Sequence, residues 1–390
     1  MQKNEGHTAK ENKSQDRFFK RLPDSFVRIT QSMERSRSTL LIIGIVFVFV
    51  LVGINVVVFV MVRGGGWARQ RRAPTTQPRN HATTQPSRLL DGVNVEYAST
   101  TAMAPYAVMV ENSMDAWPLS GPAKANVVFE APVEGSITRF MLMFDPSATT
   151  TEIGPVRSAR PYFVEWANAY GAMYAHVGGS PDALNLIRRL DGFQDLNQFW
   201  HGNDFWRSSS HYAPHNVFTS MDRLASAASK QGVSTTTFQA WSYEDRVRSP
   251  QTTVRETTST DIIVPYQGAY EAEWEYVSST GLYERSQNNH LERDADGATV
   301  EVKNVVVMLV DSSVLDAVGR LEIQTTGSGK ALLFRDGTVQ TGTWSREKGK
   351  TIRFETGDGH DMLFAPGKTW ISAVDDAAGF DKIIDKSTSQ

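Results

Sequence analysis

The most pronounced hydrophobic pattern in the chain is an uncharged apolar run between Thr39 and Val62. A helix needs about 20 such residues to cross the hydrocarbon core of a bilayer. A cleaved secretory signal has a shorter apolar segment, of about 7 to 15 residues, followed by small residues at the cleavage site. The pattern therefore predicts an uncleaved transmembrane signal anchor at residues 39–62.

The segments on either side of this run are polar and predict no core. Residues 1–38 lack periodicity, which is typical of a disordered cytosolic tail, and residues 63–103 form a linker rich in Pro, Thr, Gln and Arg. Lys and Arg are equally frequent on both flanks, so their distribution does not orient the anchor. Large domains after a first apolar segment are translocated largely regardless of charge. We therefore expect a single-pass protein of the cell membrane, with a cytoplasmic N-terminus and extracytoplasmic folded domains.

Residues 104–233 alternate between short apolar runs and helical patterns, which predicts a mixed α/β domain. Apolar residues at helical spacing predict three helices, which begin at Pro161, after the cap Ser180, and at Ser220. Gly232 ends the third helix. Runs rich in β-branched and aromatic residues predict strands at 106–110, 126–129, 137–144 and 172–177.

Residues 268–376 follow a different pattern, after a polar connection at 234–267. Short apolar stretches between Gly, Asp and Asn predict strands with few helices between them, and Asp336-Gly337 is a typical hairpin turn. We therefore expect an antiparallel β-rich C-terminal domain, followed by a tail at 377–390. The predicted fold class is α+β, with one transmembrane helix before the two folded domains.

Composition narrows the functions that such domains can have. The chain has 390 residues, a net charge of −3 and no cysteine. The absence of cysteine removes disulfides, thiolate catalysis, thiolate metal sites and a lipid-carrying cysteine. A slightly negative protein also lacks the basic field that attracts a nucleic-acid backbone. We expect no nucleic-acid partner.

Glu130, Glu134 and Arg139 lie on a predicted hairpin and its turn. Two carboxylates about 5 to 9.5 Å apart can divide the roles of acid and base in glycoside hydrolysis, so Glu130 and Glu134 are candidate catalytic residues. The alternative is a Glu–Arg pair that fixes the turn. Glu111, at the end of the first predicted strand, is a further candidate with the same two interpretations.

Arg157, Ser158 and Arg160 immediately precede the first predicted helix. Two guanidinium groups beside the free N–H groups of a helix N-terminus can bind a carboxylate or a phosphate. In the alternative interpretation, both arginines pair with Glu130 and Glu134 in a buried network. The sequence leaves both interpretations open.

Gly178, Gly179 and Ser180 connect a predicted strand to the second predicted helix, where glycines allow a ligand to approach the backbone closely. They match neither a phosphate-binding P-loop nor a dinucleotide fingerprint, and Ser180 is best interpreted as a helix cap. His176, at the end of the strand, is a candidate general base. A hydrogen-bonded structural histidine is the alternative.

An aromatic loop that begins at Phe193 is expected to lie over the site, with Arg207, His215 and Asn216 at its border. His215 and the histidine four residues before it have the spacing of zinc ligands on a helix, but Pro214 disrupts such a helix. We expect no metal ion and no cofactor.

Several motifs in fixed order point to a known family. AVMVEN, SGPAKANVVFE, VEGSITRF, IGPVRSARPYF, AHVGGSPDA and APHNVFTS resemble the YerB-like envelope lipoprotein family of bacteria, whose domain has no known function. WEYVSSTGLYER, KNVVVMLV, GTW and GKTWISAV are similar to the smaller second domain of that family. The resemblance covers roughly residues 88–375 and implies an extracytoplasmic, membrane-anchored protein without an established activity. This chain departs from the lipoproteins because it has no cysteine to carry a lipid.

These observations favour a binding module that presents a cleft to a cell-envelope component, such as peptidoglycan or an anionic glycopolymer. A hydrolase of such a polymer, with Glu134 or Glu130 as acid or base, is the first alternative. A scaffold whose β-domain recruits an envelope protein is the second. The membrane is the expected partner in all three cases.

Overall fold

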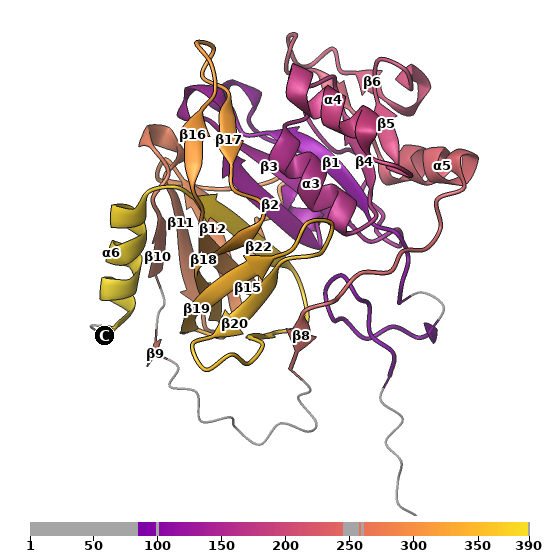
Figure 1. Ribbon diagram of the computed structural model, residues 1–390. Helices are drawn as coiled ribbons and strands as arrows, with labels where there is room; N and C mark the ends of the chain where they lie inside the picture. Colours follow the sequence, from indigo (N-terminus) through magenta and orange to yellow (C-terminus); the bar gives the residue numbers. More distant parts are fainter. Residues whose placement is uncertain (1–84, 99–100, 245–256, 259–260, 389–390) are drawn as a thin grey trace, which may run out of the picture. The chain divides into compact units, whose positions relative to one another are not determined.

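The computed structural model of the protein describes residues 85–98, 101–244, 257–258 and 261–388 (Figure 1). These residues belong to one compact unit. The predicted tail at 1–38 and the predicted anchor at 39–62 lie outside the described residues. Within the described ranges, no helix is both long enough and apolar enough to cross a membrane.

The centre of the fold is one 11-stranded sheet, with strands in the order β20-β19-β18-β15-β22-β2-β3-β1-β4-β5 and β9 paired with β19 (Figure 1). The N-terminal part of the chain contributes β1 (Tyr106–Glu111), β2 (Val127–Pro132), β3 (Thr138–Phe144), β4 (Met173–His176) and β5 (Asp195–Asn197). The C-terminal part contributes β9 (Thr257–Thr258), β15 (Asn304–Leu309), β18 (Gly327–Arg335), β19 (Thr338–Arg346), β20 (Arg353–Thr356) and β22 (Thr369–Val374).

The two parts of the chain meet inside this sheet, where β2 pairs in parallel with β22 from Val127↔Thr369 to Glu130↔Ser372. The two segments that the sequence predicts as successive domains therefore share one sheet. β22 is also parallel to β15, so the expectation of a purely antiparallel C-terminal part is wrong. Parallel neighbours need a long crossover connection, and the strands between β15 and β22 supply it. The α+β class itself is confirmed.

Successive side chains of each strand point to opposite faces of the large sheet, and the central strands β1, β2, β3 and β22 are buried on both. One face packs against α3 (Pro161–Ala169), where the rings of Phe129 and Trp166 stack 5.2 Å apart. The other face packs against a second, five-stranded sheet, where Trp274 meets Trp370 edge to face at 5.3 Å. The second sheet consists of β10 (Asp261–Val264), β11 (Ala272–Val277), β12 (Leu282–Gln287), β13 (His290–Leu291) and β14 (Glu301–Val302).

The helices of the N-terminal part begin where the sequence predicts, and the third also ends as predicted. α3 has proline at its first turn, and α4 (Pro181–Arg189) is capped by the Ser180 hydroxyl, which accepts the N–H of Ala183 at 3.2 Å. α5 (Met221–Gln231) ends at Gly232, whose φ of 72° suits glycine. The predictions for these three helices are confirmed.

Two segments are more ordered than the sequence suggests. Leu90, in the predicted linker, is buried, and its carbonyl accepts the Tyr243 hydroxyl at 3.0 Å. Residues of the predicted C-terminal tail form α6 (Ala377–Thr388), which lies beside β10 and buries Phe380 (Figure 1).

The remaining elements are short. They are the 3-10 turns η2 (Met114–Ala116), η3 (Pro122–Lys124), η4 (Glu134–Ser136), η5 (Gly202–Asp204) and η6 (Gly268–Tyr270), and the strands β6 (Trp206–Arg207), β7 (Val217–Phe218), β8 (Ser242–Tyr243), β16 (Ser312–Val314), β17 (Leu321–Ile323) and β21 (Leu363–Phe364).

Candidate functional site

Most of the candidate residues gather at the carboxyl ends of β1, β4 and β5, which run parallel to one another. In open sheets of parallel strands, ligands bind outside the carboxyl ends of the strands. Glu111 ends β1 and His176 ends β4. The segment before α3 crosses this edge, because the Glu111 N–H bonds the Pro155 carbonyl at 3.1 Å and the Val177 N–H bonds the Arg157 carbonyl at 3.0 Å.

The sheet separates Glu130 from the other candidates. Arg139 is paired in register with Ala131 and Glu111, whereas Glu130 is paired with Phe140. Because side chains alternate along a strand, Arg139 points toward α3 and Glu130 points toward the five-stranded sheet. The predicted constellation of Glu130, Glu134 and Arg139 is therefore divided between two faces.

Glu130 is part of a buried network that joins the two sheets. Its Oε1 accepts the Thr138 hydroxyl at 2.8 Å and Arg285 Nη2 at 2.9 Å, and its Oε2 accepts Trp370 Nε1 at 2.8 Å. Arg285 also bonds Glu292 and lies over the Trp370 ring. Neither Glu130 nor Arg285 is exposed to solvent. Glu130 is thus held as an ion-pair partner inside the core.

Glu134 and Arg160 form a bidentate ion pair near the surface. Glu134 lies in η4, the turn between β2 and β3, and its oxygens accept Arg160 Nε at 2.7 Å and Nη2 at 2.6 Å. Burial raises the pKa of the Glu134 carboxyl, but the hydrogen bonds and charge of Arg160 outweigh burial and lower it. Arg160 therefore pairs with Glu134, and neither Arg157 nor Arg160 pairs with Glu130.

Arg139 is the most buried of the three arginines, with 6% of its surface exposed. Its Nη1 donates to the Ser158 carbonyl at 2.9 Å, and within the described part of the chain no carboxylate lies at ion-pair distance from it. Burial, with the nearby positive charges of Arg160 and Arg157, lowers the pKa of Arg139 to about 10. We call Arg139, Arg157 and Arg160, with Glu111 and Glu134, the arginine cluster.

The remaining carboxylate of the cluster, Glu111, is shared by two partners. Its Oε2 lies 2.6 Å from His215 Nδ1, and its Oε1 lies 3.4 Å from Arg157 Nε. Arg157 Nη1 also donates to the Pro214 carbonyl at 3.2 Å. The loop between β6 and β7 thus reaches the cluster through His215. Next to this loop, Arg207 Nη1 donates to Asn216 Oδ1 at 2.7 Å, and among the described residues neither side chain is hydrogen-bonded to the cluster.

His176 and the glycines after it have structural contacts. The His176 ring is fully buried, with Nδ1 at 2.6 Å from the Gly178 carbonyl and Nε2 at 2.7 Å from Asp195 Oδ1. Both ring nitrogens therefore have partners within the fold, as the structural interpretation of His176 expects. Gly178 has φ of 58° and leaves space for the Phe199 ring, since a Cβ there would lie 2.9 Å from Phe199 Cε2. At Gly179 a Cβ would lie 3.1 Å from the Ala159 side chain. Close packing explains both glycines without a ligand.

Tyr174 is a residue of this edge that the sequence analysis did not single out. It is fully buried in β4, and its hydroxyl has no hydrogen-bond partner among the described residues. Its pKa is raised by burial, while the charges of Arg139 and Arg160 oppose the rise. Tyr174 thus has a buried hydroxyl without a partner among the described residues, in a region where the charges of Arg139 and Arg160 act on it.

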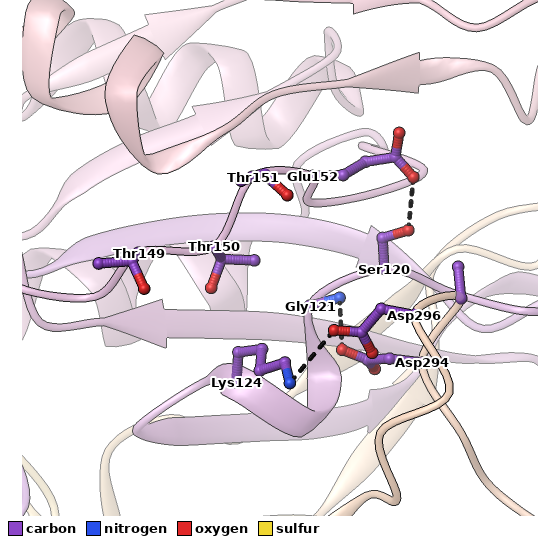
Figure 2. Close-up of a pocket in the computed structure, with 10 residues that line it drawn as sticks. Ser120, Gly121, Lys124, Thr149, Thr150, Thr151, Glu152, Asp294 and Asp296 are labelled. Atoms are coloured by element: carbon purple, nitrogen blue, oxygen red, sulfur yellow. Dashed lines mark hydrogen bonds and ion pairs between the residues drawn. The ribbon is translucent and has the colours of Figure 1, made fainter.

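A separate polar pocket of about 480 Å³ lies where the two parts of the chain meet (Figure 2). Its charged groups already have partners: Lys124 pairs with Asp296 at 3.2 Å, and Asp294 accepts the N–H groups of Gly121 and Ala123 at 3.0 Å each. These contacts join the two parts of the chain. The run Thr149 to Thr151 also lines the pocket. In the described ranges, no group of three or more acidic or histidine side chains is arranged to hold a metal ion.

The chain is similar to known proteins over both of its parts. Residues 90–234 match the family described as "Protein of unknown function (DUF3048) N-terminal domain", and residues 262–371 match the corresponding C-terminal domain. The chain is 32% identical over 294 residues to a protein of Bacillus subtilis (strain 168) named "Putative lipoprotein YerB", which covers 74% of this chain and 86% of that protein. The chain belongs to the YerB-like family.

The crystal structure of the YerB protein from Bacillus subtilis has the same fold. It superposes with a TM-score of 0.67 at 31% identity and covers 76% of this chain and 98% of that one. The YerB-like resemblance noted in the sequence is thereby confirmed. The boundary between the two YerB-like family segments falls in the connection before β10, and the shared sheet places both segments in one structural unit.

Proposed function

We propose that this protein is held at the cell membrane and binds the anionic groups of an extracytoplasmic envelope polymer through the arginine cluster. The observation that carries the proposal is the buried guanidinium of Arg139. A buried charge without a carboxylate partner costs free energy unless a ligand compensates it. The cluster has three guanidinium groups and two carboxylates, so it has an excess of positive charge at the carboxyl ends of β1 and β4.

Membrane attachment rests on two observations. The sequence at residues 39–62 predicts a transmembrane anchor, and the Bacillus subtilis relative carries the word lipoprotein in its name. An anchor and a lipid both attach a folded domain to a membrane. The linker after the anchor would confine the cluster to the space next to the membrane, where peptidoglycan and anionic glycopolymers are found.

A hydrolase using Glu130 and Glu134 has less support than a binding module. The Glu130 carboxylate is paired with Arg285 in the core, and the Glu134 carboxylate is paired with Arg160. An acid and a base for glycoside hydrolysis would need to face one bond from the same cavity. A scaffold role remains a prediction from sequence alone.

The test uses the full-length protein in detergent, incubated with insoluble peptidoglycan that either carries or lacks its attached anionic polymer. Bound protein and released soluble fragments are both measured, for the wild type, Arg139→Gln and Arg157→Ala. Arg293→Gln, an exposed arginine of the C-terminal part, is the matched control. We expect retention without fragments, and at least a tenfold loss of retention in the two cluster variants only. Fragment release, or equal retention of all variants, contradicts the proposal.

A further inference from the structure

The charges of the arginine cluster are unevenly distributed. Glu111 is shared by Arg157 and His215, and both oxygens of Glu134 are used by Arg160. Arg139 is left with a neutral acceptor, the Ser158 carbonyl. A guanidinium group has five N–H donors, so Arg139 retains most of its hydrogen-bonding capacity.

Glu134 is the carboxylate of the cluster that can leave most easily. Its side chain is 20% exposed, whereas that of Glu111 is 6% exposed. It belongs to an exposed turn in which Gly135 and Ser136 have φ of 70° and 61°. Glu134 can therefore rotate into solvent with less rearrangement of the surrounding chain than Glu111.

A ligand that reaches Arg160 must take the place of Glu134. If the ligand is a singly charged carboxylate, Arg160 exchanges the Glu134 carboxylate for another carboxylate. Its interactions before and after the exchange are then nearly equal. A doubly charged phosphate group has further acceptor oxygens and a second charge, which the remaining N–H donors of Arg139 can use. Glu134 therefore competes for Arg160 about equally with a carboxylate ligand and poorly with a doubly charged phosphate group. This difference in competition separates the two classes of anion.

We propose that Glu134 determines the specificity of the arginine cluster, so that the site takes a doubly charged phosphate group in preference to a singly charged carboxylate or phosphodiester. This inference rests on the proposed function. The phosphate group belongs either to a phosphorylated sugar or to a phosphorylated lipid headgroup, since both carry the same chemistry.

The test titrates the full-length protein in detergent, at about pH 8 where inorganic phosphate is mostly doubly charged. Inorganic phosphate, dimethyl phosphate and acetate are compared by isothermal calorimetry for the wild type, Glu134→Gln, Glu134→Asp and Arg139→Gln. Glu273→Gln is the matched control, because it makes the same change on an exposed residue of the second sheet. Thermal unfolding of each variant confirms that it is folded. Glucose 1-phosphate and vesicles containing phosphatidic acid then separate the two sources of the group.

We expect the wild type to bind inorganic phosphate at least tenfold more tightly than acetate or dimethyl phosphate. Glu134→Gln should bind acetate at least tenfold more tightly than the wild type does, so that the ratio of the two affinities falls. Glu134→Asp should behave in the same way, since its shorter side chain does not reach Arg160. If the ratio of phosphate affinity to acetate affinity is unchanged in both Glu134 variants, the inference is overturned. Binding that depends on Arg139 would still support the proposed function in that case. Failure of Arg139→Gln to weaken phosphate binding contradicts the proposed function itself.

Discussion

Glu130 and Arg285 are 155 residues apart in the sequence and form an ion pair of 2.9 Å in which neither side chain is exposed to solvent. The pair joins β2 of the large sheet to β12 of the second sheet. Burial lowers the pKa of Arg285, but the charges of Glu130 and Glu292 outweigh burial and raise it. A carboxylate that the sequence suggests as a catalyst is thus a structural link between the two parts of the chain.

Substitution of Glu130 by glutamine should destabilise the protein strongly. Removal of one member of a buried ion pair costs about 3 to 5 kcal/mol, and we expect about 3 kcal/mol because Arg285 keeps Glu292. Urea unfolding of the full-length protein in detergent, followed by tryptophan fluorescence, measures the change. Exposed Glu273→Gln should stay within about 0.5 kcal/mol of the wild type. A loss below about 1 kcal/mol for Glu130→Gln would show that the network contributes little.

Local sequence signals were sufficient for the helices. Ser180 caps α4 and Gly232 ends α5, and each signal acts within a few residues of its own position. The hairpin turn at Asp336-Gly337 likewise joins β18 and β19. The pairing of β2 with β22 could not be predicted, because it depends on which strands meet after the whole sheet has formed.

In the candidate site, too, local sequence signals could be predicted, whereas contacts that depend on strand pairing could not. Arg157 and Arg160 stand out in the sequence because they immediately precede a helix, and the structure brings both to the cluster. The position of Glu130 on the opposite face depends on the register of β2 with β3. Tyr174 was missed because an aromatic residue within a buried strand is a typical core residue.

Arg139→Gln should leave the free energy of unfolding unchanged or raise it. The pKa of Arg139 is lowered to about 10, so the fold disfavours the charged form that is present at neutral pH. At about 1.4 kcal/mol per pH unit, the charged side chain of Arg139 costs the folded state about 3 kcal/mol, which the substitution removes. The substitution also removes the hydrogen bond to the Ser158 carbonyl, and this loss reduces the gain by about 1 kcal/mol. Urea unfolding without ligand tests the prediction. A clear loss of stability would mean that Arg139 serves the fold and not a ligand.

Protonation of Asp294 should stabilise the fold at mildly acidic pH. Burial raises the pKa of its carboxyl from 3.8 to about 6, against the opposing N–H groups of Ala123 and Gly121. The folded state therefore binds the proton more tightly than the unfolded state, and stability falls as pH rises from about 4 to about 6. The expected decrease is about 2 to 3 kcal/mol.

Unfolding curves between about pH 4 and pH 7 measure this slope, with Asp294→Asn as the variant that should lose it. The raised pKa of Glu292 acts in the same direction and remains in the variant. The lowered pKa of Glu134 acts in the opposite direction, because its stabilisation is lost only as pH falls through that lowered pKa. An equal slope in the wild type and Asp294→Asn would assign the pH dependence to other groups.

Tyr174→Phe and Tyr162→Phe remove the same atom from two buried tyrosines and should differ in their effect on stability. The Tyr162 hydroxyl donates to the Pro132 carbonyl at 2.7 Å, so its loss should destabilise the protein by about 1 kcal/mol. The Tyr174 hydroxyl has no partner among the described residues, so its removal should be neutral or stabilising by up to about 1 kcal/mol. If the hydroxyl serves a bound phosphate group, Tyr174→Phe should also weaken phosphate binding severalfold, and Tyr162→Phe should not. Equal destabilisation in both variants would show that Tyr174 has a structural hydrogen bond in solution, and would remove it from the site.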